Sequence, residues 1–303
     1  MKVLCTGGGG FLGAWIAKRL LAGGHAVRVF DRRNDRRLLD EIAGKRAGTV
    51  EWRIGDVVKP ADVMAASEGC DAIIHLAALL TPACRADPIA GTNVNLIGTI
   101  NVFEAARHLR MRSVAYASSA GVFGPDSGVV PFPMTLYGAY KLACEGVGRA
   151  YAADYGVASV GFRPLTVYGP GRELGASAGP SIACKMAAQG EAYTIPFTGD
   201  TDMIFVDDVA AAFEAAVLRL IKGAHVFNLR GVVTSIDHVV AEIRRLAPSA
   251  VISARGEVPP IAADLEPHDV EALLGPLPRT ELAEGLRQTI EFYRRQRAKQ
   301  GPA

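Results

Sequence analysis

The 303-residue sequence is poor in cysteine and has no marked excess of either charge. Its five cysteines form no C-x-x-C pair, have no histidine cluster beside them and are odd in number, which argues against a disulfide framework and against a zinc site. The 33 Lys and Arg residues balance 31 Asp and Glu residues, so the formal net charge is only +2. This balance gives no indication of a nucleic-acid or membrane surface, and we expect a cytoplasmic protein with reduced thiols and no metal site.

Long apolar segments are also missing. No uncharged apolar run reaches the length of a membrane span, and Met1 leads directly into the predicted strand "KVLCT", so we expect neither a membrane helix nor a signal peptide. Half of the residues are hydrophobic and 21% are charged, a balance typical of globular proteins. The length is sufficient for one large domain or two closely joined ones.

Short β-rich runs alternate with helical patterns through the first half of the chain. Strands are predicted at 2–6, 25–31, 49–56, 70–78 and 113–119, and helices at 11–24, 36–44, 90–110 and from about residue 137 onward. Such alternation predicts right-handed crossovers and a parallel sheet with helices on both faces. We therefore predict an α/β fold with a Rossmann-type, doubly wound parallel sheet that binds its ligand at the carboxyl ends of the strands.

The second half is less regular and predicts a smaller C-terminal α/β lobe. The pattern indicates a strand at 158–169, a small-residue loop at 169–181, a strand turning into a helix at 203–220, and a further strand of the main sheet at 225–231. Helical patterns at 182–190, 235–247 and 279–296 flank a short strand at 250–255. The two lobes are therefore expected to be interleaved in sequence.

The segment "TGGGGFLG" (6–13) follows the first predicted strand and opens the first helix. Read as G-x-x-G-x-x-G, its glycines are Gly7, Gly10 and Gly13, with Phe11 and Leu12 in the first helical turn. A pyrophosphate needs backbone N–H groups directed at it and no Cβ in its way, and the helix dipole adds to its binding. In this strand–loop–helix context the segment predicts a dinucleotide-binding loop. The alternative is a glycine-rich turn that binds nothing.

Carboxylates follow the second and third predicted strands. Asp31 stands about 20 residues after the glycine loop, where a carboxylate can accept hydrogen bonds from both ribose hydroxyls of NAD and repel a 2′-phosphate. We predict NAD in preference to NADP, although Arg32 beside it could hold such a phosphate. Asp56, followed by Val57, could reach the adenine amino group or could cap a turn.

Tyr137 and Lys141, in "TLYGAYKLACE", are four residues apart and share one face of a predicted helix. Taken alone, this spacing is typical of an ordinary surface pair. Eight motifs in the same order change the interpretation of this pair. Together they make the sequence resemble the extended short-chain dehydrogenase/reductases, the superfamily that includes UDP-galactose 4-epimerase. The motifs cover nearly the whole chain: "TGGGGFLG", "GDV" (55–57), "HLAA" (75–78), "NLIGTINVFEAA" (95–106), "YASSAGVFG" (116–124), "YGAYK" (137–141), "FRPLTVYGPG" (162–171) and "FVDDVAAAF" (205–213).

The resemblance implies that Ser119, Tyr137 and Lys141 are the catalytic residues. Tyr137 would exchange a proton with the substrate, and Ser119 would hold the substrate oxygen. A free phenol is a poor base at neutral pH, but a lysine ammonium one turn away and the positive charge of an oxidised nicotinamide both favour the phenolate. Lys141 would also bind the nicotinamide ribose.

Further residues are implied to contact the cofactor: Leu76, Ala77, Ala78, Asn95, Ser118, Pro164 and Val167. Asn95 could equally be a polar residue satisfied inside a helix. His75, at a predicted strand end, is interpreted as structural. Asp207 and Asp208 are interpreted as helix-capping and packing residues, not as acid–base groups.

The reaction is less well determined. Ala120 and Gly121 stand where the dehydratases of the superfamily carry Asp-Glu, Thr166 stands where UDP-sugar epimerases carry Asn, and no R-P-G-D-like segment precedes "AADLEP". The loop with Arg172 could line a pocket for a small polyol, sugar acid or hydroxy acid, or could be a surface lid. We predict an NAD-dependent oxidoreductase acting on a secondary alcohol of a sugar-like or hydroxy-acid substrate, with Thr166 and Arg172 at the substrate. The alternatives are an epimerase that retains NAD and a non-catalytic dinucleotide sensor.

The domain prediction follows from this assignment. Residues 1–163 and 204–230 are expected to form the NAD-binding domain, and residues 164–203 and 231–303 the substrate-binding lobe. The superfamily often dimerises through the helices after the fourth strand and around the tyrosine, so a homodimer is expected.

Overall fold

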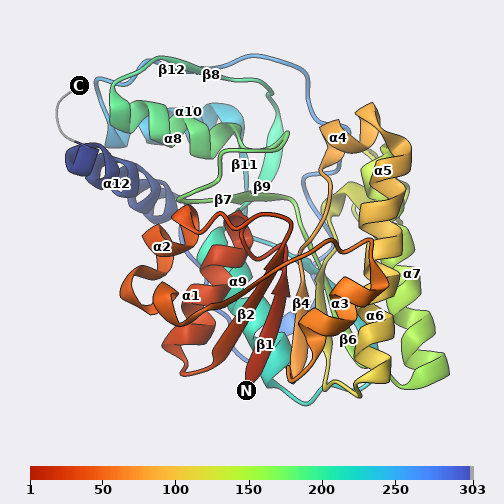
Figure 1. The fold of residues 1–303 in the computed structure, drawn as a ribbon. Helices are drawn as coiled ribbons and strands as arrows, with labels where there is room; N and C mark the ends of the chain where they lie inside the picture. The colour runs from red at the N-terminus through yellow and green to blue at the C-terminus, as the bar shows by residue number, and fades with distance from the viewer. Residues whose placement is uncertain (301–303) are drawn as a thin grey trace.

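A parallel sheet of seven strands, in the order β10-β6-β5-β4-β1-β2-β3, forms the centre of the molecule. It is seen in Figure 1, drawn from the computed structural model, which describes residues 1–300. Its strands are β1 (Lys2–Thr6), β2 (Ala26–Asp31), β3 (Glu51–Ile54), β4 (Ala72–His75), β5 (Val114–Ala117), β6 (Ser159–Pro164) and β10 (Ala224–Leu229). The predicted Rossmann-type fold is confirmed.

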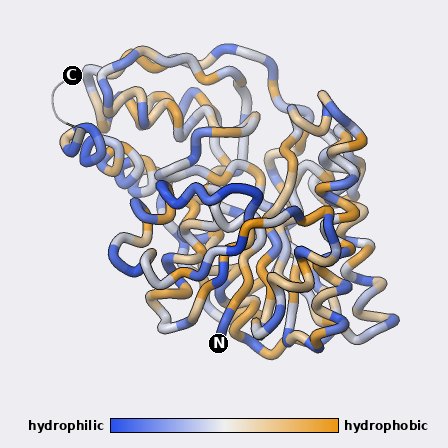
Figure 2. The backbone as a smooth tube through the Cα atoms, viewed as in Figure 1, coloured by the Kyte–Doolittle hydropathy of each residue, from blue (hydrophilic) through white to orange (hydrophobic). Residues whose placement is uncertain are grey.

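Side chains of the central strands alternate between two buried faces. Val3 and Cys5 of β1 join the cluster under α1 (Phe11–Ala22) and α9 (Val206–Leu218), whereas Leu4 joins the one under α3 (Pro60–Ser67) and α6 (Gly98–His108). Figure 2 shows the resulting hydrophobic strands inside the fold, with hydrophilic stretches at its surface. Because both faces are covered, these strands are continuous apolar runs.

The other helices are α2 (Arg37–Ala43), α4 (Thr81–Ala86), α5 (Pro88–Thr92), α7 (Leu136–Tyr155), α8 (Gly179–Gln189), α10 (Ile236–Leu246), α11 (Val270–Leu274) and α12 (Leu282–Gln300). Short helical turns lie at η1 (Gly44–Thr49), η2 (Asn93–Ile97) and η3 (Ala120–Val122). The helix predicted at 90–110 is thus in three parts, since Pro88 starts α5 and η2 is a π-helical turn before α6. None of the described helices combines the length and hydropathy of a membrane span.

Two small sheets lie beyond the carboxyl ends of the main strands (Figure 1). One has the order β11-β9-β7, from β11 (Val232–Ser235), β9 (Asp200–Phe205) and β7 (Thr166–Tyr168), and the other pairs β12 (Ile252–Ala254) with β8 (Tyr193–Ile195). The single strand predicted at 158–169 was therefore wrong. Pro164 ends β6, and after Leu165 the chain enters a different sheet, because proline has no N–H with which to continue the ladder.

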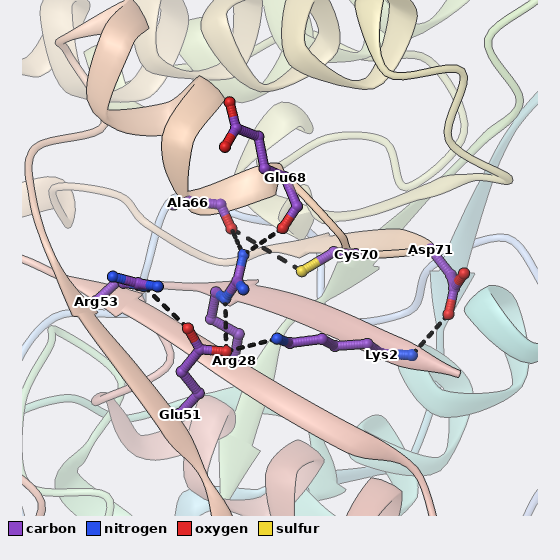
Figure 3. Close-up of polar contacts among 8 residues, drawn as sticks. All are labelled: Lys2, Arg28, Glu51, Arg53, Ala66, Glu68, Cys70 and Asp71. Atoms are coloured by element: carbon purple, nitrogen blue, oxygen red, sulfur yellow. Dashed lines mark hydrogen bonds and ion pairs between the residues drawn. The ribbon is translucent and has the colours of Figure 1, made fainter.

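A polar network joins the outer strand β3 to the amino-terminal ends of β1 and β2 (Figure 3). Arg28 is buried, donates to the carbonyls of Ala66 and Glu68 at 2.7 Å, and places its Nε 3.0 Å from Glu51. The Lys2 ammonium, 2.6 Å from the same carboxylate, and the Arg28 guanidinium lower the pKa of Glu51 to about 2. The network lies at the edge opposite to the ligand side, so we assign it to stability.

Asp202 of β9 predicts an unusual pH dependence. It is fully buried, Oδ1 accepts from the N–H of Gly231 at 2.7 Å, and Oδ2 has no partner among the described residues. Burial raises its pKa from 3.8 to about 6. The folded protein therefore binds this proton more tightly than the unfolded chain does. The free energy of unfolding should fall as pH rises from about 4 to 6.5, by about 3 kcal/mol in total.

Denaturant unfolding between pH 4 and 8 should therefore show that Asp202→Asn lacks this decline. Asp200→Asn, at an exposed carboxylate on the same strand, is the control and should follow the wild type. An identical pH slope for Asp202→Asn and the wild type would contradict this assignment.

Candidate active site

A cleft of about 1320 Å³ opens between the main sheet and the small sheets. Most of the residues predicted from the sequence line it: Gly7, Gly10, Phe11, Leu12, Gly13, Asp31, Arg32, Val57, Leu76, Ala77, Ala78, Ser118, Ser119, Tyr137, Lys141, Pro164, Thr166, Val167 and Arg172. Asp56 and Asn95 are not among its lining residues. The strand ends thus bring together residues from distant parts of the chain, as a doubly wound sheet requires.

The glycine loop joins β1 to α1 in the close packing that a dinucleotide loop needs. Gly7 has φ +66°, and a Cβ there would lie 2.7 Å from the backbone nitrogen of Ala77. A Cβ at Gly13 would lie 2.5 Å from the Cα of Gly8, so α1 can pack against the loop only with glycine there. The N-cap residue Gly10 makes no side-chain cap, and the first turn of α1 has no acidic residue. The N–H groups of this turn are thus free of any described side-chain acceptor and suit a pyrophosphate.

Asp31 ends β2 beside this loop. Its Oδ2 accepts from the N–H of Gly9 at 3.1 Å, which fixes the carboxylate at the cleft. Arg32 is largely exposed, and its Nε lies 3.8 Å from Asp56. Asp56 Oδ1 accepts a hydrogen bond from the N–H of Val58, so Asp56 caps a turn, as one of its two predicted roles requires. Its contact with the adenine amino group stays a prediction.

The first turn of α7 places Tyr137 beside Ser119. Thr135 caps the helix by accepting from the N–H of Gly138 at 3.0 Å. A Cβ at Gly138 would clash with the carbonyl oxygen of Gly121. A Cβ on Gly121 would lie 3.2 Å from Ser119 Oγ and 3.8 Å from the Tyr137 ring, so the two side chains flank this glycine. Glycines at 121 and 138 therefore let η3 and α7 approach closely.

Lys141 is buried one turn further along α7. Its Nζ donates to the carbonyl of Ala117 at 2.6 Å, at the end of β5, and lies 5.6 Å from the centroid of the Tyr137 ring. Both Tyr137 and Lys141 line the cleft. The Tyr–Lys pair therefore lies in the cleft wall, not on an open helix surface.

Glu145 is a residue whose importance the sequence did not reveal. It lies one further turn along α7, is fully buried, and accepts from Ser118 Oγ at 2.5 Å. Arg163 of β6 donates to both of its oxygens, at 2.7 and 2.6 Å. This forked pair joins α7, β5 and β6 directly behind the proposed catalytic residues, and the i, i+4 spacing after Lys141 was its one sequence signal.

Two polar residues beneath the cleft have structural partners. Asn95, in the π-helical turn η2, donates to the carbonyl and accepts from the N–H of Leu79, which fastens the loop after β4. His75 lies between the hydroxyls of Thr6 and Thr99, at 2.7 and 3.0 Å. Burial, with a contribution from the Lys141 charge, lowers the pKa of His75 to about 3. These contacts agree with a structural His75, and the cofactor role of Asn95 stays a prediction.

Thr166 and Arg172 also line the cleft. The Thr166 hydroxyl is 2.7 Å from that of Thr201. Arg172 donates to Ser177 Oγ at 3.2 Å and lies over the Phe11 ring, while its Nε is buried with no partner among the described residues. Burial lowers the pKa of this guanidinium. Further lining residues that the sequence did not indicate include Leu79–Thr81, Pro196–Phe197, Asp200–Thr201, 257–261, Arg37, Leu38, Glu41, Phe292 and Gln296.

Comparison with known proteins identifies the class to which this fold and cleft belong. The model of the NAD dependent epimerase/dehydratase family matches residues 3–229, and the chain belongs to this family. It is 32% identical to a UDP-glucose 4-epimerase of Mycolicibacterium smegmatis, over 97% of this chain and 99% of that protein. It is 30% identical to a 2-alkyl-3-oxoalkanoate reductase of Stenotrophomonas maltophilia, over 74% of this chain and 67% of that protein.

Among solved structures, the complex of Thermus thermophilus UDP-glucose 4-epimerase with NAD superposes with a TM-score of 0.82. The sequence identity is 27%, and the match covers 97% of this chain and 99% of that one. The predicted family, enzyme class and NAD cofactor are confirmed. The comparisons favour the epimerase alternative over the dehydrogenase that we placed first.

Proposed function

We propose that this chain is an NAD-dependent epimerase that inverts a secondary alcohol carbon of a sugar-like substrate. Ser119, Tyr137 and Lys141 lie in one cleft with the glycine loop, and this arrangement carries the proposal. The whole-length similarity to a UDP-glucose 4-epimerase supports inversion over net oxidation.

The loop after β7 supports retention of the cofactor. It runs from Gly171 to Ser177 along the cleft, and a Cβ at Gly175 would lie 3.1 Å from the Leu80 side chain of the loop after β4. The two loops therefore meet across the cleft. A dinucleotide lying between the glycine loop and Lys141 would be covered by this contact, which would slow its release.

Bound NAD would supply the hydride acceptor and donor of the reaction. The glycine-loop N–H groups would hold its pyrophosphate, Asp31 its adenosine ribose and Lys141 its nicotinamide ribose. Tyr137 would take the proton of the substrate hydroxyl as the alcohol is oxidised to a ketone. It would return the proton to the same oxygen when the ketone, after rotating, is reduced on its opposite face. Ser119 would donate a hydrogen bond to the substrate oxygen throughout, while Thr166 and Arg172 would orient the rest of the substrate.

The first test is to denature the purified protein and identify any released dinucleotide by mass spectrometry. We expect NAD near one per chain, together with inversion of a substrate without net accumulation of NADH. An empty protein that binds added NAD and forms NADH would instead favour the dehydrogenase. Release of NADP would contradict the assignment of Asp31.

A second candidate is an oxidoreductase that interconverts a non-nucleotide hydroxy acid and the corresponding keto acid. The similarity to the 2-alkyl-3-oxoalkanoate reductase and the guanidinium of Arg172, which lines the cleft, favour it. The same Ser119, Tyr137 and Lys141 would serve this reaction. It requires the cofactor to exchange, so the experiment above distinguishes the two.

We also propose the predicted division into lobes, with residues 1–163 and 204–230 binding NAD and residues 164–203 and 231–303 binding substrate. The membership of β10 in the main sheet and of β7, β9 and β11 in a separate sheet supports it. The homodimer stays a prediction. Exposed Ile89, Ile97 and Leu136 on α5, η2 and α7 suit such an interface, and light scattering that detects only a 32 kDa species would contradict it.

A further inference from the structure

Three further segments line the cleft, and we call them together the distal wall. They follow β8, begin β9 and follow β12: Pro196, Phe197, Asp200, Thr201, Glu257, Val258, Pro259, Pro260 and Ile261. The inference below concerns the part of the substrate that reaches this wall, and it rests on the proposed function.

The wall lies beside the catalytic turn η3, away from the glycine loop. Ile261 and Leu265 pack with Ala120, Val122 and Phe123, and the N–H of Ala262 donates to the carbonyl of Gly124 at 2.9 Å. The N–H of Thr198 donates to the carbonyl of Glu257 at 3.3 Å, which joins the segment after β8 to the one after β12. A substrate held at Ser119 would therefore have this wall beside it.

The chemistry of the wall is apolar and acidic. Six of its residues are apolar: Pro196, Phe197, Val258, Pro259, Pro260 and Ile261. Its two charged residues, Asp200 and Glu257, are both carboxylates with exposed side chains. The Thr201 hydroxyl already shares a hydrogen bond with Thr166.

No described residue of the wall is a lysine or arginine. The basic residues of the cleft lie elsewhere: Arg32, Arg33 and Arg37 near the end of β2, Lys141 beside Tyr137, and Arg172 against Phe11. The adjacent prolines at 259 and 260 also lack the N–H groups that hold phosphate oxygens in backbone sites. Among the described side chains that form this wall, a diphosphate would thus meet two carboxylates and no cation, an unfavourable arrangement of charge.

We propose that the distal wall receives an uncharged, apolar group of the substrate and disfavours a nucleoside diphosphate. The substrate class is then a sugar-like secondary alcohol that carries an alkyl or aryl substituent. The uncharged group gains free energy by covering the apolar surface of Val258, Pro260 and Ile261, which are exposed or half-buried. The specificity of this chain differs in this respect from the nucleotide-sugar enzymes that it resembles.

The test measures binding of two probes to the NAD-loaded protein by calorimetry, 4-nitrophenyl β-D-glucopyranoside and UDP-glucose. We expect the aryl glucoside to bind at least about tenfold more tightly than UDP-glucose. Glu257→Lys should tighten UDP-glucose by about tenfold, because one repulsive charge becomes attractive, and leave the glucoside nearly unchanged. Asp154→Lys, the same charge change on an exposed residue at the far end of α7, is the matched control and should alter neither affinity.

The proposal is overturned if UDP-glucose binds as tightly as the glucoside, if the glucoside does not bind, or if Glu257→Lys and Asp154→Lys behave alike. Absorbance at 340 nm and product analysis separate this from the proposed function. Inversion of UDP-glucose would overturn the inference and leave the epimerase standing. Net NADH formation from the glucoside would overturn the epimerase and leave the inference standing.

Discussion

Tyr137→Phe is expected to lower kcat by about a thousandfold, because it removes only the hydroxyl that would carry the proton to and from the substrate. The ring would remain between Gly121 and Lys141, so the shape of the cleft should be preserved. The measurement is the rate of inversion, or of NADH formation if the cofactor exchanges. NAD content and unfolding temperature are recorded on the same samples.

Tyr140→Phe is the matched control on the same helix. The Tyr140 hydroxyl donates to the carbonyl of Pro88 at 3.0 Å, and Tyr140 does not line the cleft. Loss of this phenol should leave kcat within about twofold, since a hydrogen bond of this kind contributes about 1 kcal/mol to stability and nothing to the reacting atoms. Equal losses in the two variants would contradict the role of Tyr137, as would retained NAD with full activity in Tyr137→Phe.

Glu145→Ala is expected to destabilise the fold by about 3–5 kcal/mol, because it leaves the Arg163 guanidinium buried without its carboxylate. It also removes the hydrogen-bond acceptor of the Ser118 hydroxyl, which donates to Glu145 in the wild-type protein. Denaturant unfolding of the protein checks the stability. We expect the remaining folded protein to lose affinity for NAD as well, since the pair connects β5, α7 and β6 behind the cofactor side.

The double variant Glu145→Met/Arg163→Met distinguishes a lost pair from an uncompensated charge. Apolar side chains of similar size should recover much of the stability, because neither charge then needs a partner in the interior. The Arg287–Glu284 pair on α12, 2.6 Å apart with both side chains nearly half exposed, provides the control. Arg287→Ala should cost far less stability than Glu145→Ala, because solvent screens an exposed ion pair. A loss in Glu145→Ala no larger than this would show that the buried pair is not a structural brace.

Much of the fold follows from local patterns in the sequence. The apolar run of β4 and the strand–loop–helix setting of the glycine loop are short-range signals, so their interpretation as parts of a parallel α/β sheet was correct. The division of 158–169 into β6 and β7 could not be read in the same way. Both pieces are β-rich, and their assignment to different sheets depends on partners such as Phe227 and Ile204, which lie far along the chain.

The same contrast holds at the site. Tyr137 and Lys141 share a helix face by spacing alone, but only the tertiary structure places Ser119 across Gly121 from Tyr137. Glu145 reads as one more polar helix residue until Arg163 and Ser118 are seen to surround it. The substrate end is the extreme case, because Phe197, Thr201 and Glu257 come from three separate segments with no shared motif.

The sequence by itself therefore determined the strand–helix alternation of the first half, the glycine loop, the tyrosine–lysine pair and the cofactor class, because each depends on residues that are close together in the chain. The tertiary structure decided which charges meet in the interior and which side chains face the far end of the cleft. Both features depend on contacts between segments that are distant in the chain. These contacts stabilise the protein only when the small sheets pack over the carboxyl ends of the main sheet.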